Sequence, residues 1–424
     1  MIDSIAGTVK KIIPRGVFLF LQPLYHFFLA WFAALFYGFP SRNLTVIGVT
    51  GTKGKTTVVE LVREILKRGG YKVASISSLS FVIGDREEQN FYKMTLPGRF
   101  FVQHFLHRAR RSGCKYAVLE VTSEGIKQFR HRFIKFDVAI LTNVASEHIE
   151  AHGSFEKYLR AKLDLFWRLP KEGLAIINQD DPRAARFSAA TAAHKMYYGK
   201  DAVNSLIVKH SMFDNGVEFE VNGATIRSPL MGEFNFYNIL AAAAVGLSQQ
   251  ISLEKIASAF SGVDNISGRM EFIQREPFAV MVDYAHTPDS LRQVYKFLRP
   301  KSQRLICVLG AAGGGRDKWK RPEFGKIASE FCDEIILTNE DPYDENPAAI
   351  IEDIERGIPT SYKLKAKSFL DRREAIYNAL KSAQAGDTVV ITGKGAEPWI
   401  MGPNNTKIPW DDRRVVREEL QKLD

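Results

Sequence analysis

The chain has 424 residues, which is more than one hydrophobic core usually serves, so we expect two or three domains. Its apolar content of 45% and charged content of 25% are those of an ordinary soluble globular protein. Lys and Arg exceed Asp and Glu by ten (58 − 48), which favours an anionic ligand, but no basic tract with interleaved aromatic residues argues for nucleic acid.

Residues 17–38 (VFLFLQPLYHFFLAWFAALFYG) form an apolar run without formal charge, preceded by basic residues. No small-residue cleavage site follows, so a secretory signal peptide fits poorly. The run is nearly long enough to span a bilayer, but Gln22, Pro23 and His26 interrupt it. Two interpretations stay open: a helix lying at the inner surface of a membrane, and a helix packed on the protein body, which the pattern favours.

After Pro40, strand and helix patterns alternate. The expected strands are Leu44–Val49, Tyr116–Val121, Val138–Leu141 and Leu174–Ile177. Thr57–Arg68 has one apolar face and predicts a helix that ends at Gly69-Gly70. This alternation predicts an α/β fold with a mostly parallel sheet covered on both faces.

A second series of strand patterns begins near Ala279. Its expected strands are Ala279–Val282, Leu305–Leu309, Glu334–Leu337 and Thr388–Ile391. They predict a smaller, Rossmann-like α/β domain. We therefore divide the chain into an apolar segment 1–43, a central domain 44–273 and a C-terminal domain 274–424.

Three scattered cysteines, Cys114, Cys307 and Cys332, form neither a disulfide framework nor a CxxC metal pair. We expect them to be reduced core thiols of a cytoplasmic protein.

Residues 48–60 read GVTGTKGKTTVVE and lie between a strand and a helix. Such a turn aims backbone N–H groups at one point, where the helix dipole adds positive charge, so phosphate binds. Lys55 can reach β- and γ-phosphates and Thr56 can hold Mg²⁺. The loop predicts a nucleoside triphosphate site, although Val49 stands where the strict GxxxxGK[ST] pattern has glycine.

Three further residues are candidates for chemistry. Glu120 ends a strand that reads as buried, where a carboxylate is costly unless it meets a cation. His148 follows another strand, at the edge where α/β sheets bind ligands. Lys162 reads as a solvated helix residue when judged by pattern alone.

Together these motifs resemble the Mur ligases, and most closely the MurE type, which use ATP to add the third stem residue in peptidoglycan synthesis. The resemblance runs from Leu44 to the C-terminus. It rests on GTKGKTT, LEVTSEG, HGSFEKYLRAKLDLF, GEFNFYN, SGRMEF, DYAHTPDSL, GRDKWKRP and GKGAEP, in the order of the family. It implies that a peptide carboxylate becomes an acyl phosphate, which the amine of an amino acid then attacks.

The resemblance also implies roles for individual residues. ATP would be held by Gly51, Thr52, Lys53, Gly54, Lys55, Thr56, Thr57, Asn235, Asn238, Arg269 and Asp283. Two Mg²⁺ would be held by Thr56, Glu120, His148 and Lys162, the last as a carbamate, and the catalytic set would be Lys55, Glu120, His148 and Lys162. The muramoyl peptide would contact Thr95, Thr122, Gln128 and Arg130, and the amino acid would contact Arg316, Glu340, Asp341, Tyr343 and Glu397.

The chain departs from the family pattern in two places. Only 43 residues precede Leu44, where MurE-type enzymes have a domain that grips uridine diphosphate, so the acid substrate is either UDP-linked, which we favour, or lipid-linked. In TNEDPYDENP, Tyr343 replaces the arginine with which related enzymes bind diaminopimelate, and a tyrosine cannot pair with a carboxylate as a guanidinium does. Because this loop is acidic, we expect a basic amino acid.

Two alternatives remain open from the sequence. One is another ligase of the superfamily, such as a folylpolyglutamate synthase. The other is a membrane-associated nucleotide-binding protein without ligase activity, which would need neither Glu120 nor Lys162.

Overall fold

The computed structural model describes residues 15–92, 94–145, 152–200, 209–213, 216–221 and 224–423, and only the backbone of 15–20 and 209–213. The chain forms two compact units that divide between Asp264 and Asn265, here called unit 1 and unit 2. The expected boundary at 273/274 falls instead inside strand β12 (Glu271–Gln274), which pairs with the sheet of unit 2. The strand could not be recognised from its short, mixed sequence.

Unit 1 is built on an eight-stranded sheet in the order β4-β3-β2-β5-β1-β6-β7-β8. The strands are β1 (Thr45–Thr50), β2 (Val73–Ile76), β3 (Ser80–Ile83), β4 (Arg86–Gln89), β5 (Tyr116–Glu120), β6 (Val138–Leu141), β7 (Leu174–Asn178) and β8 (His194–Tyr198). All pairings are parallel except those of β3 and β4. The mostly parallel sheet predicted from the sequence is thus confirmed.

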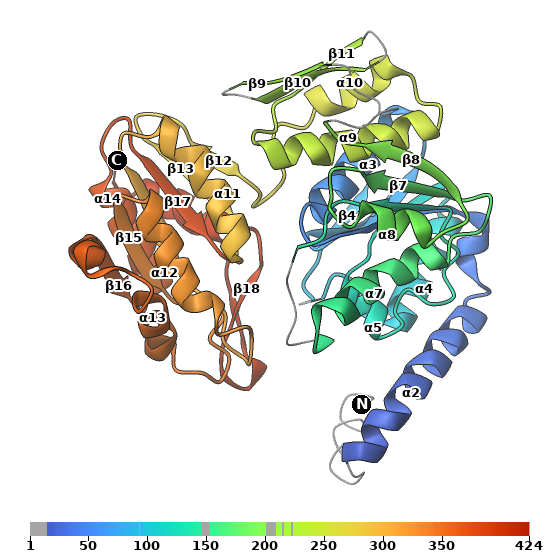
Figure 1. The fold of residues 1–424 in the computed structure, drawn as a ribbon, viewed down its shortest axis with the longest axis horizontal. Coiled ribbons are helices and arrows are strands. Elements are labelled where there is room, and N and C mark those ends of the chain that lie inside the picture. The colour runs from blue at the N-terminus through green and yellow to red at the C-terminus, as the bar shows by residue number, and fades with distance from the viewer. Residues whose placement is uncertain are drawn as a thin grey trace. The chain divides into compact units, whose positions relative to one another are not determined.

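Helices cover both faces of this sheet, with α3 and α9 on one side and α4, α5 and α7 on the other (Figure 1). The helices of unit 1 are α2 (Arg15–Phe36), α3 (Lys55–Arg68), α4 (Arg99–Arg111), α5 (Ser123–Lys127), α7 (Phe155–Trp167), α8 (Ala184–Ala189), α9 (Glu233–Ser248) and α10 (Leu253–Ser261). A small antiparallel sheet adds β9 (Lys209–Phe213), β10 (Gly216–Val221) and β11 (Ala224–Ser228). Because consecutive residues of β1 and β5 are buried, their sequences read as continuous apolar runs.

Helix α2, the blue helix in Figure 1, is the observed form of the apolar N-terminal segment. Its small residues Ala30, Ala33 and Ala34 are buried, and it packs on α4. Its other side exposes the large apolar residues Leu21, Leu24, Tyr25, Phe28, Trp31, Phe32, Leu35 and Phe36. Within the described ranges, no helix is long and apolar enough to cross a membrane. Packing on the body is therefore observed, and contact with a membrane surface stays a prediction.

Unit 2 contains a six-stranded sheet in the order β12-β13-β17-β14-β15-β16. Its strands are β13 (Ala279–Asp283), β14 (Leu305–Leu309), β15 (Glu334–Thr338), β16 (Ala366–Phe369) and β17 (Thr388–Thr392), parallel throughout, with β12 antiparallel at the edge. The helices are α11 (Pro288–Leu298), α12 (Lys320–Phe331), α13 (Pro347–Glu355), α14 (Arg372–Ser382) and α15 (Asp412–Leu420), and β18 (Trp399–Met401) pairs with β19 (Lys407–Pro409). The predicted Rossmann-like α/β domain is confirmed.

The expectation that all cysteines are reduced is wrong for one pair, because Cys307 and Cys332 form a disulfide with their Cα atoms 6.1 Å apart. Cys307 lies in β14, and Cys332 follows α12 at the point where the chain returns to the neighbouring strand β15. A parallel crossover thus brings together residues that are 25 positions apart in sequence. Cys114 is a buried free thiol, as expected.

Candidate functional site

The predicted phosphate loop, residues 51–54, joins β1 to α3 and requires glycine at both ends. Gly51 has φ +151°, and a Cβ there would lie 1.9 Å from Thr142 Oγ1. Gly54 has φ +80° and caps α3 without a side-chain acceptor for the first-turn amides. That place at a helix N-terminus is one that an anion can fill.

Neighbouring side chains hold this loop in shape. Lys53 O accepts from Thr142 Oγ1 (2.6 Å) and Asn143 Nδ2 (3.1 Å), while Lys53 N donates to Asn143 Oδ1 (3.0 Å). Lys55 Nζ donates to the carbonyls of Gly51 (3.1 Å) and Thr52 (2.8 Å), so its ammonium lies over the loop. Phosphate oxygens can replace these two acceptors. Asn143 carried no motif and was missed by the sequence reasoning.

Oxygen atoms from three elements meet beside the loop. Thr56 Oγ1 donates to Glu120 Oε2 (2.9 Å) and lies 2.8 Å from Ser78 Oγ, and Ser78 N also donates to Glu120 Oε2 (3.0 Å). Glu120 is buried at the end of β5. Mg²⁺ prefers oxygen ligands and is usually held by one or two carboxylates together with substrate phosphates. The donor set therefore fits a magnesium ion, and Ser78, which follows the unpredicted strand β2, was missed.

Lys162 is not the solvated residue that the helix pattern alone suggests. Its side chain is 1% exposed, its Nζ donates to Gly51 O (2.6 Å), and it lies 4.5 Å from the ring centre of Tyr158. His148 lies outside the described residues, so its predicted place at the metal stays a prediction. Over the part of the chain that the structure describes, no group of three His, Cys, Asp or Glu side chains forms a metal cage.

His152 is a further residue of this region that the sequence reasoning missed. It is buried, and its Nε2 lies 3.1 Å from Ser123 Oγ. Burial, followed by the positive charges of Lys127 and Lys162, lowers the pKa of His152 to about 4. It is therefore a neutral imidazole beside the phosphate loop at neutral pH.

The two asparagines predicted to contact ATP lie on α9. Both are buried, and Asn238 Nδ2 donates to Asn235 Oδ1 (3.0 Å). A Cβ at Gly54 would lie 2.1 Å from Asn238 Oδ1, so this side chain packs directly on the phosphate loop. The fold thus brings the asparagines and the loop together.

The residues predicted to hold the muramoyl peptide also gather in unit 1. Arg130 donates from Nη1 to Leu96 O (2.5 Å), next to Thr95, and from Nη2 to Gln128 Oε1 (2.7 Å). Thr122 caps α5 and accepts from Gly125 N (3.1 Å). The loop before α4, the cap of α5 and the segment after α5 form one cluster.

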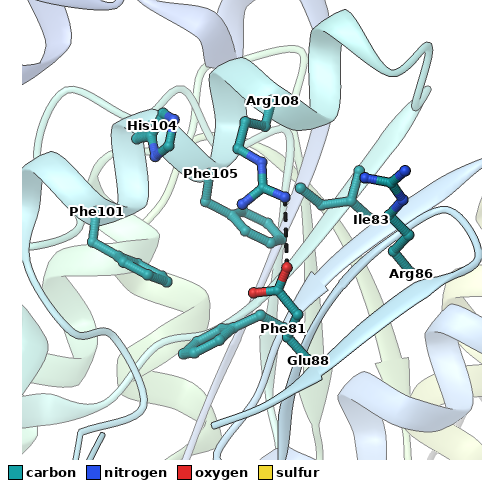
Figure 2. Close-up of a pocket in the computed structure, with 8 residues that line it drawn as sticks. All are labelled: Phe81, Ile83, Arg86, Glu88, Phe101, His104, Phe105 and Arg108. Atoms are coloured by element: carbon teal, nitrogen blue, oxygen red, sulfur yellow. Dashed lines mark ion pairs between the residues drawn. The ribbon is translucent and has the colours of Figure 1, made fainter. Parts of the chain in front are cut away.

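A small cavity of about 30 Å³ lies between the β3–β4 hairpin and α4 (Figure 2). Aromatic side chains such as Phe81 and Phe101 line it, and Arg108 pairs with Glu88 (3.6 Å) beside it. None of the predicted site residues lines this cavity, which holds little more than one water molecule. It is therefore not the substrate site.

In unit 2 the predicted residues lie at the carboxyl ends of parallel strands, where α/β sheets bind ligands. These ends carry Asp283 (β13), Arg316 (after β14), Glu340, Asp341 and Tyr343 (after β15), and Lys394 and Glu397 (after β17). Lys394 is fully buried and pairs with Asp341 (2.9 Å) and Glu397. Burial opposes its charge, but the nearby carboxylates raise the pKa of Lys394 well above its usual range. The sequence reasoning missed this lysine.

The two residues of unit 2 that were predicted to contact the nucleotide, Arg269 and Asp283, contact neighbouring residues of unit 2. The Arg269 guanidinium lies 4.1 Å from the ring centre of Tyr284, whose hydroxyl donates to Glu397 Oε1 (2.9 Å). Asp283 accepts backbone N–H bonds from Met270 (2.7 Å) and Ala285 (2.7 Å). Asp283 therefore shapes the turn, and its contact with ATP stays a prediction.

The acidic loop after β15 is largely neutralised within unit 2. Asp344 accepts from Asn404 N (2.7 Å), and Glu345 accepts from Arg321 Nη2 (2.9 Å). Asp341 already pairs with Lys394. Glu340 differs, because its Oε2 is buried and has no hydrogen-bond partner among the described residues.

We predict that Glu340→Gln stabilises the protein at alkaline pH. Burial, and then repulsion by Asp341, raises the pKa of Glu340 to about 7. Because the folded state holds this proton more tightly than the unfolded state, stability falls as the pH rises from about 4.5 to about 7, by up to about 3 kcal/mol. Urea unfolding at pH 8 should show Glu340→Gln to be more stable than the wild type by about 1–3 kcal/mol, with little difference at pH 4.5.

Glu345→Gln is the matched control. Desolvation raises the pKa of Glu345, but the hydrogen bonds from Arg321, Gly315 N and Lys318 together outweigh it, so the pKa is lowered. Its substitution should destabilise the protein at neutral pH. A Glu340→Gln variant that is less stable than the wild type at pH 8 would show that the ionised carboxylate is needed for the fold.

Residues 49–246 match the model of the Mur ligase middle domain, and residues 268–395 match that of the Mur ligase, glutamate ligase domain. A protein of Gloeobacter violaceus named UDP-N-acetylmuramoyl-L-alanyl-D-glutamate--2,6-diaminopimelate ligase is 39% identical over 398 residues, which cover 92% of this chain and 80% of that protein. A solved structure of a ligase of the same name is 29% identical, with a TM-score of 0.60, over 90% of this chain and 79% of that one. A folylpolyglutamate synthase of Mycobacterium tuberculosis shares the fold alone, with a TM-score of 0.71 at 18% identity over 88% of this chain and 92% of that one.

Proposed function

Since this chain belongs to the Mur ligase family, we propose that it joins the terminal carboxylate of a UDP-linked muramoyl dipeptide to a basic amino acid. The chain is an ATP-dependent ligase that forms a peptide bond in peptidoglycan synthesis. One observation carries the proposal: the phosphate loop, the Thr56–Glu120–Ser78 oxygen cluster and Lys162 meet in one unit that also holds the peptide-binding cluster around Arg130. The ligase function is favoured over a nucleotide-binding protein without ligase activity.

In the proposed reaction, a carboxylate oxygen of the dipeptide attacks the γ-phosphorus of ATP, and ADP leaves. The acyl phosphate is then attacked by the amine nitrogen, which loses a proton, and inorganic phosphate departs with the electrons of the broken C–O bond. Lys55, whose ammonium lies over the loop, would neutralise the charge that develops on the phosphoryl group. Mg²⁺ held by Thr56 and Glu120 would supply Lewis-acid stabilisation of the same phosphate oxygens.

Lys162, as its carbamate, would be a further magnesium ligand. Addition of CO₂ to the neutral amine gives a carboxylate-like group and releases one proton. Lys162 is among the largest fully buried side chains. An unmodified ammonium ion at this position could not bind a metal, whereas the carbamate offers the oxygen atoms that Mg²⁺ prefers.

The most specific part of the proposal is the identity of the amino acid. Tyr343 replaces the arginine of the related diaminopimelate-adding enzymes, and loop 313–315 packs against it, since a Cβ at Gly314 would lie 2.7 Å from the tyrosine ring. The buried Glu340, with an oxygen that lacks a described partner, is the acid most suited to a side-chain ammonium. These two residues favour lysine or ornithine.

A ligation assay that follows phosphate release tests both substrates together. We expect turnover with UDP-linked muramoyl dipeptide and lysine or ornithine, at least tenfold faster than with diaminopimelate, because a single well-formed charge pair contributes about 1.5–3 kcal/mol. A Tyr343→Arg variant should shift the preference toward diaminopimelate. Diaminopimelate as the sole active acceptor of the wild type would refute the basic amino acid, and activity only with a folate would refute the muramoyl substrate.

A further inference from the structure

A group of basic side chains lies where α2 meets the start of α4. His26 is in the middle of α2, Arg99 is the first residue of α4, and Arg130 follows α5. Burial, and then the positive charges of Arg99 and Arg130, lowers the pKa of His26 to about 4. Burial and the charge of Arg130 likewise lower the pKa of Arg99 to about 10. Arg99 and Arg130 both bond to Gln128, and α2 packs on α4, so the three side chains lie in one region.

Within the part of the chain that the structure describes, the hydrogen bonds of this group end on neutral acceptors. Arg99 donates from Nε (2.9 Å) and Nη2 (2.6 Å) to Gln128 O, and Arg130 donates to Leu96 O and Gln128 Oε1, which are all neutral acceptors. The acid that acts on Arg130 is Glu124, which raises the pKa of Arg130 against the stronger effect of burial. Among the described residues, Glu124 is the carboxylate that acts on Arg130, and none is found to act on Arg99.

Polar atoms in the group also lack partners. Both ring nitrogens of His26 and Nε of Arg130 are buried, and none has a hydrogen-bond partner within the described residues. Arg130 itself is 8% exposed. Buried polar atoms without partners cost free energy, and so does positive charge that is paired only with neutral acceptors. A ligand with several anionic oxygens would relieve both costs. Phosphate groups have that chemistry, and guanidinium groups bind them bidentately.

We propose that His26, Arg99 and Arg130 bind the diphosphate that links the muramoyl peptide to its carrier. The inference rests on the proposed function and deepens it. Arg130 belongs to the peptide-binding cluster, so a diphosphate at this site lies on the same substrate as the peptide. Helix α2 thereby contributes to this contact through His26. The shared ligand chemistry is a diphosphate ester, whether its carrier is uridine or a lipid.

Kinetics with two acid substrates test this site. One substrate is UDP-linked muramoyl dipeptide, and the other is muramoyl dipeptide without diphosphate. Arg99→Gln and His26→Ala should raise the KM for the diphosphate-linked substrate about 10- to 100-fold, the range for lost charge-assisted hydrogen bonds, and change its kcat little. The KM values for the diphosphate-free acid and for ATP should change less than about twofold. Arg99→Lys, which keeps the charge, should restore part of the affinity.

Arg110→Gln is the matched control. Arg110 is exposed on the same helix, eleven residues and about 16 Å further along, and its substitution should leave every KM unchanged. An equal rise in KM for both acids would show that Arg99 and His26 only shape the protein, and no rise for either acid would show that they bind no substrate. Both outcomes overturn the proposal.

A binding measurement separates this site from the ligase reaction. With the phosphate loop saturated by Mg²⁺ and a non-hydrolysable ATP analogue, calorimetry should detect inorganic diphosphate binding to the wild type and at least tenfold weaker binding to Arg99→Gln. If diphosphate binding depends on Arg99 but the protein ligates no muramoyl acid, the diphosphate site is supported and the proposed function is refuted. If no diphosphate binds, the site itself is refuted. Lipid-diphosphate-linked dipeptide in detergent micelles forms the second arm, and preference for it over the UDP-linked substrate would identify a lipid carrier.

Discussion

Lys162→Ala is expected to lower kcat on the order of 10³-fold or more while the Kd for ATP changes only a few-fold, since a metal ligand contributes several kcal/mol of transition-state stabilisation. Two physical roles for this lysine are possible. As an ammonium it donates to Gly51 O (2.6 Å) and supports the loop, and as a carbamate it holds a metal. The substitution removes both roles, so further variants must separate them.

Lys162→Arg keeps the positive charge and cannot form a carbamate, so we expect it to be as inactive as Lys162→Ala. Lys162→Glu places a carboxylate near the same position and should recover part of the rate. In the wild type, ¹³C-labelled bicarbonate should give a carbamate NMR signal that disappears in Lys162→Arg. The matched control is Lys157→Ala, since Lys157 is exposed on the same helix. A fully active Lys162→Arg enzyme would show that a cation, and not a carbamate, is required.

The second large effect is expected for Glu120→Gln. The variant keeps the shape of the side chain and one acceptor for Thr56 or Ser78, but loses the negative charge that a magnesium ion needs. We expect kcat to fall about 10²- to 10³-fold and the Mg²⁺ concentration for half-maximal rate to rise at least tenfold. Steady-state rates across a magnesium titration measure both quantities.

Glu60→Gln is the matched control for this prediction. Glu60 is also a buried carboxylate of unit 1, accepts a hydrogen bond from Ser77 (2.9 Å), and has a pKa raised by burial. Its substitution should leave the magnesium dependence unchanged. If Glu60→Gln and Glu120→Gln were equally impaired, loss of a buried hydrogen-bonding group, rather than loss of a metal ligand, would explain both.

Features that depend on neighbouring residues were predicted from the sequence, whereas contacts between distant segments were not. The glycine-rich loop between β1 and α3 was predicted from local sequence. Gly51 and Gly54 occupy backbone conformations that other residues avoid, so the glycines themselves mark the turn. The apolar runs of β1, β5, β14 and β17 were predicted for a similar reason, since strands buried on both faces have continuous apolar sequences. The short strands β2, β8 and β12 carry weaker patterns and were missed.

Contacts between distant segments could not be predicted in this way. The Cys307–Cys332 disulfide depends on a crossover helix, and Ser78 reaches Glu120 because β2 lies next to β5 in the sheet. Lys162 had the pattern of an exposed helix residue, but its helix is placed so that the ammonium meets Gly51. The charges of Arg99 and Arg130 act on His26, and these three residues come from segments that no local sequence pattern connects.

The sequence by itself determined the class of fold, the glycine-dependent loop between β1 and α3 and, through its motifs, the ligase family, because backbone conformation and burial on both faces depend on neighbouring residues. The tertiary structure alone decided which polar groups face one another: the oxygen cluster at Glu120, the buried Lys394 among carboxylates, and the basic group under α2. Electrostatic interactions depend on distance in space and on burial, and neither quantity is fixed until the chain has folded.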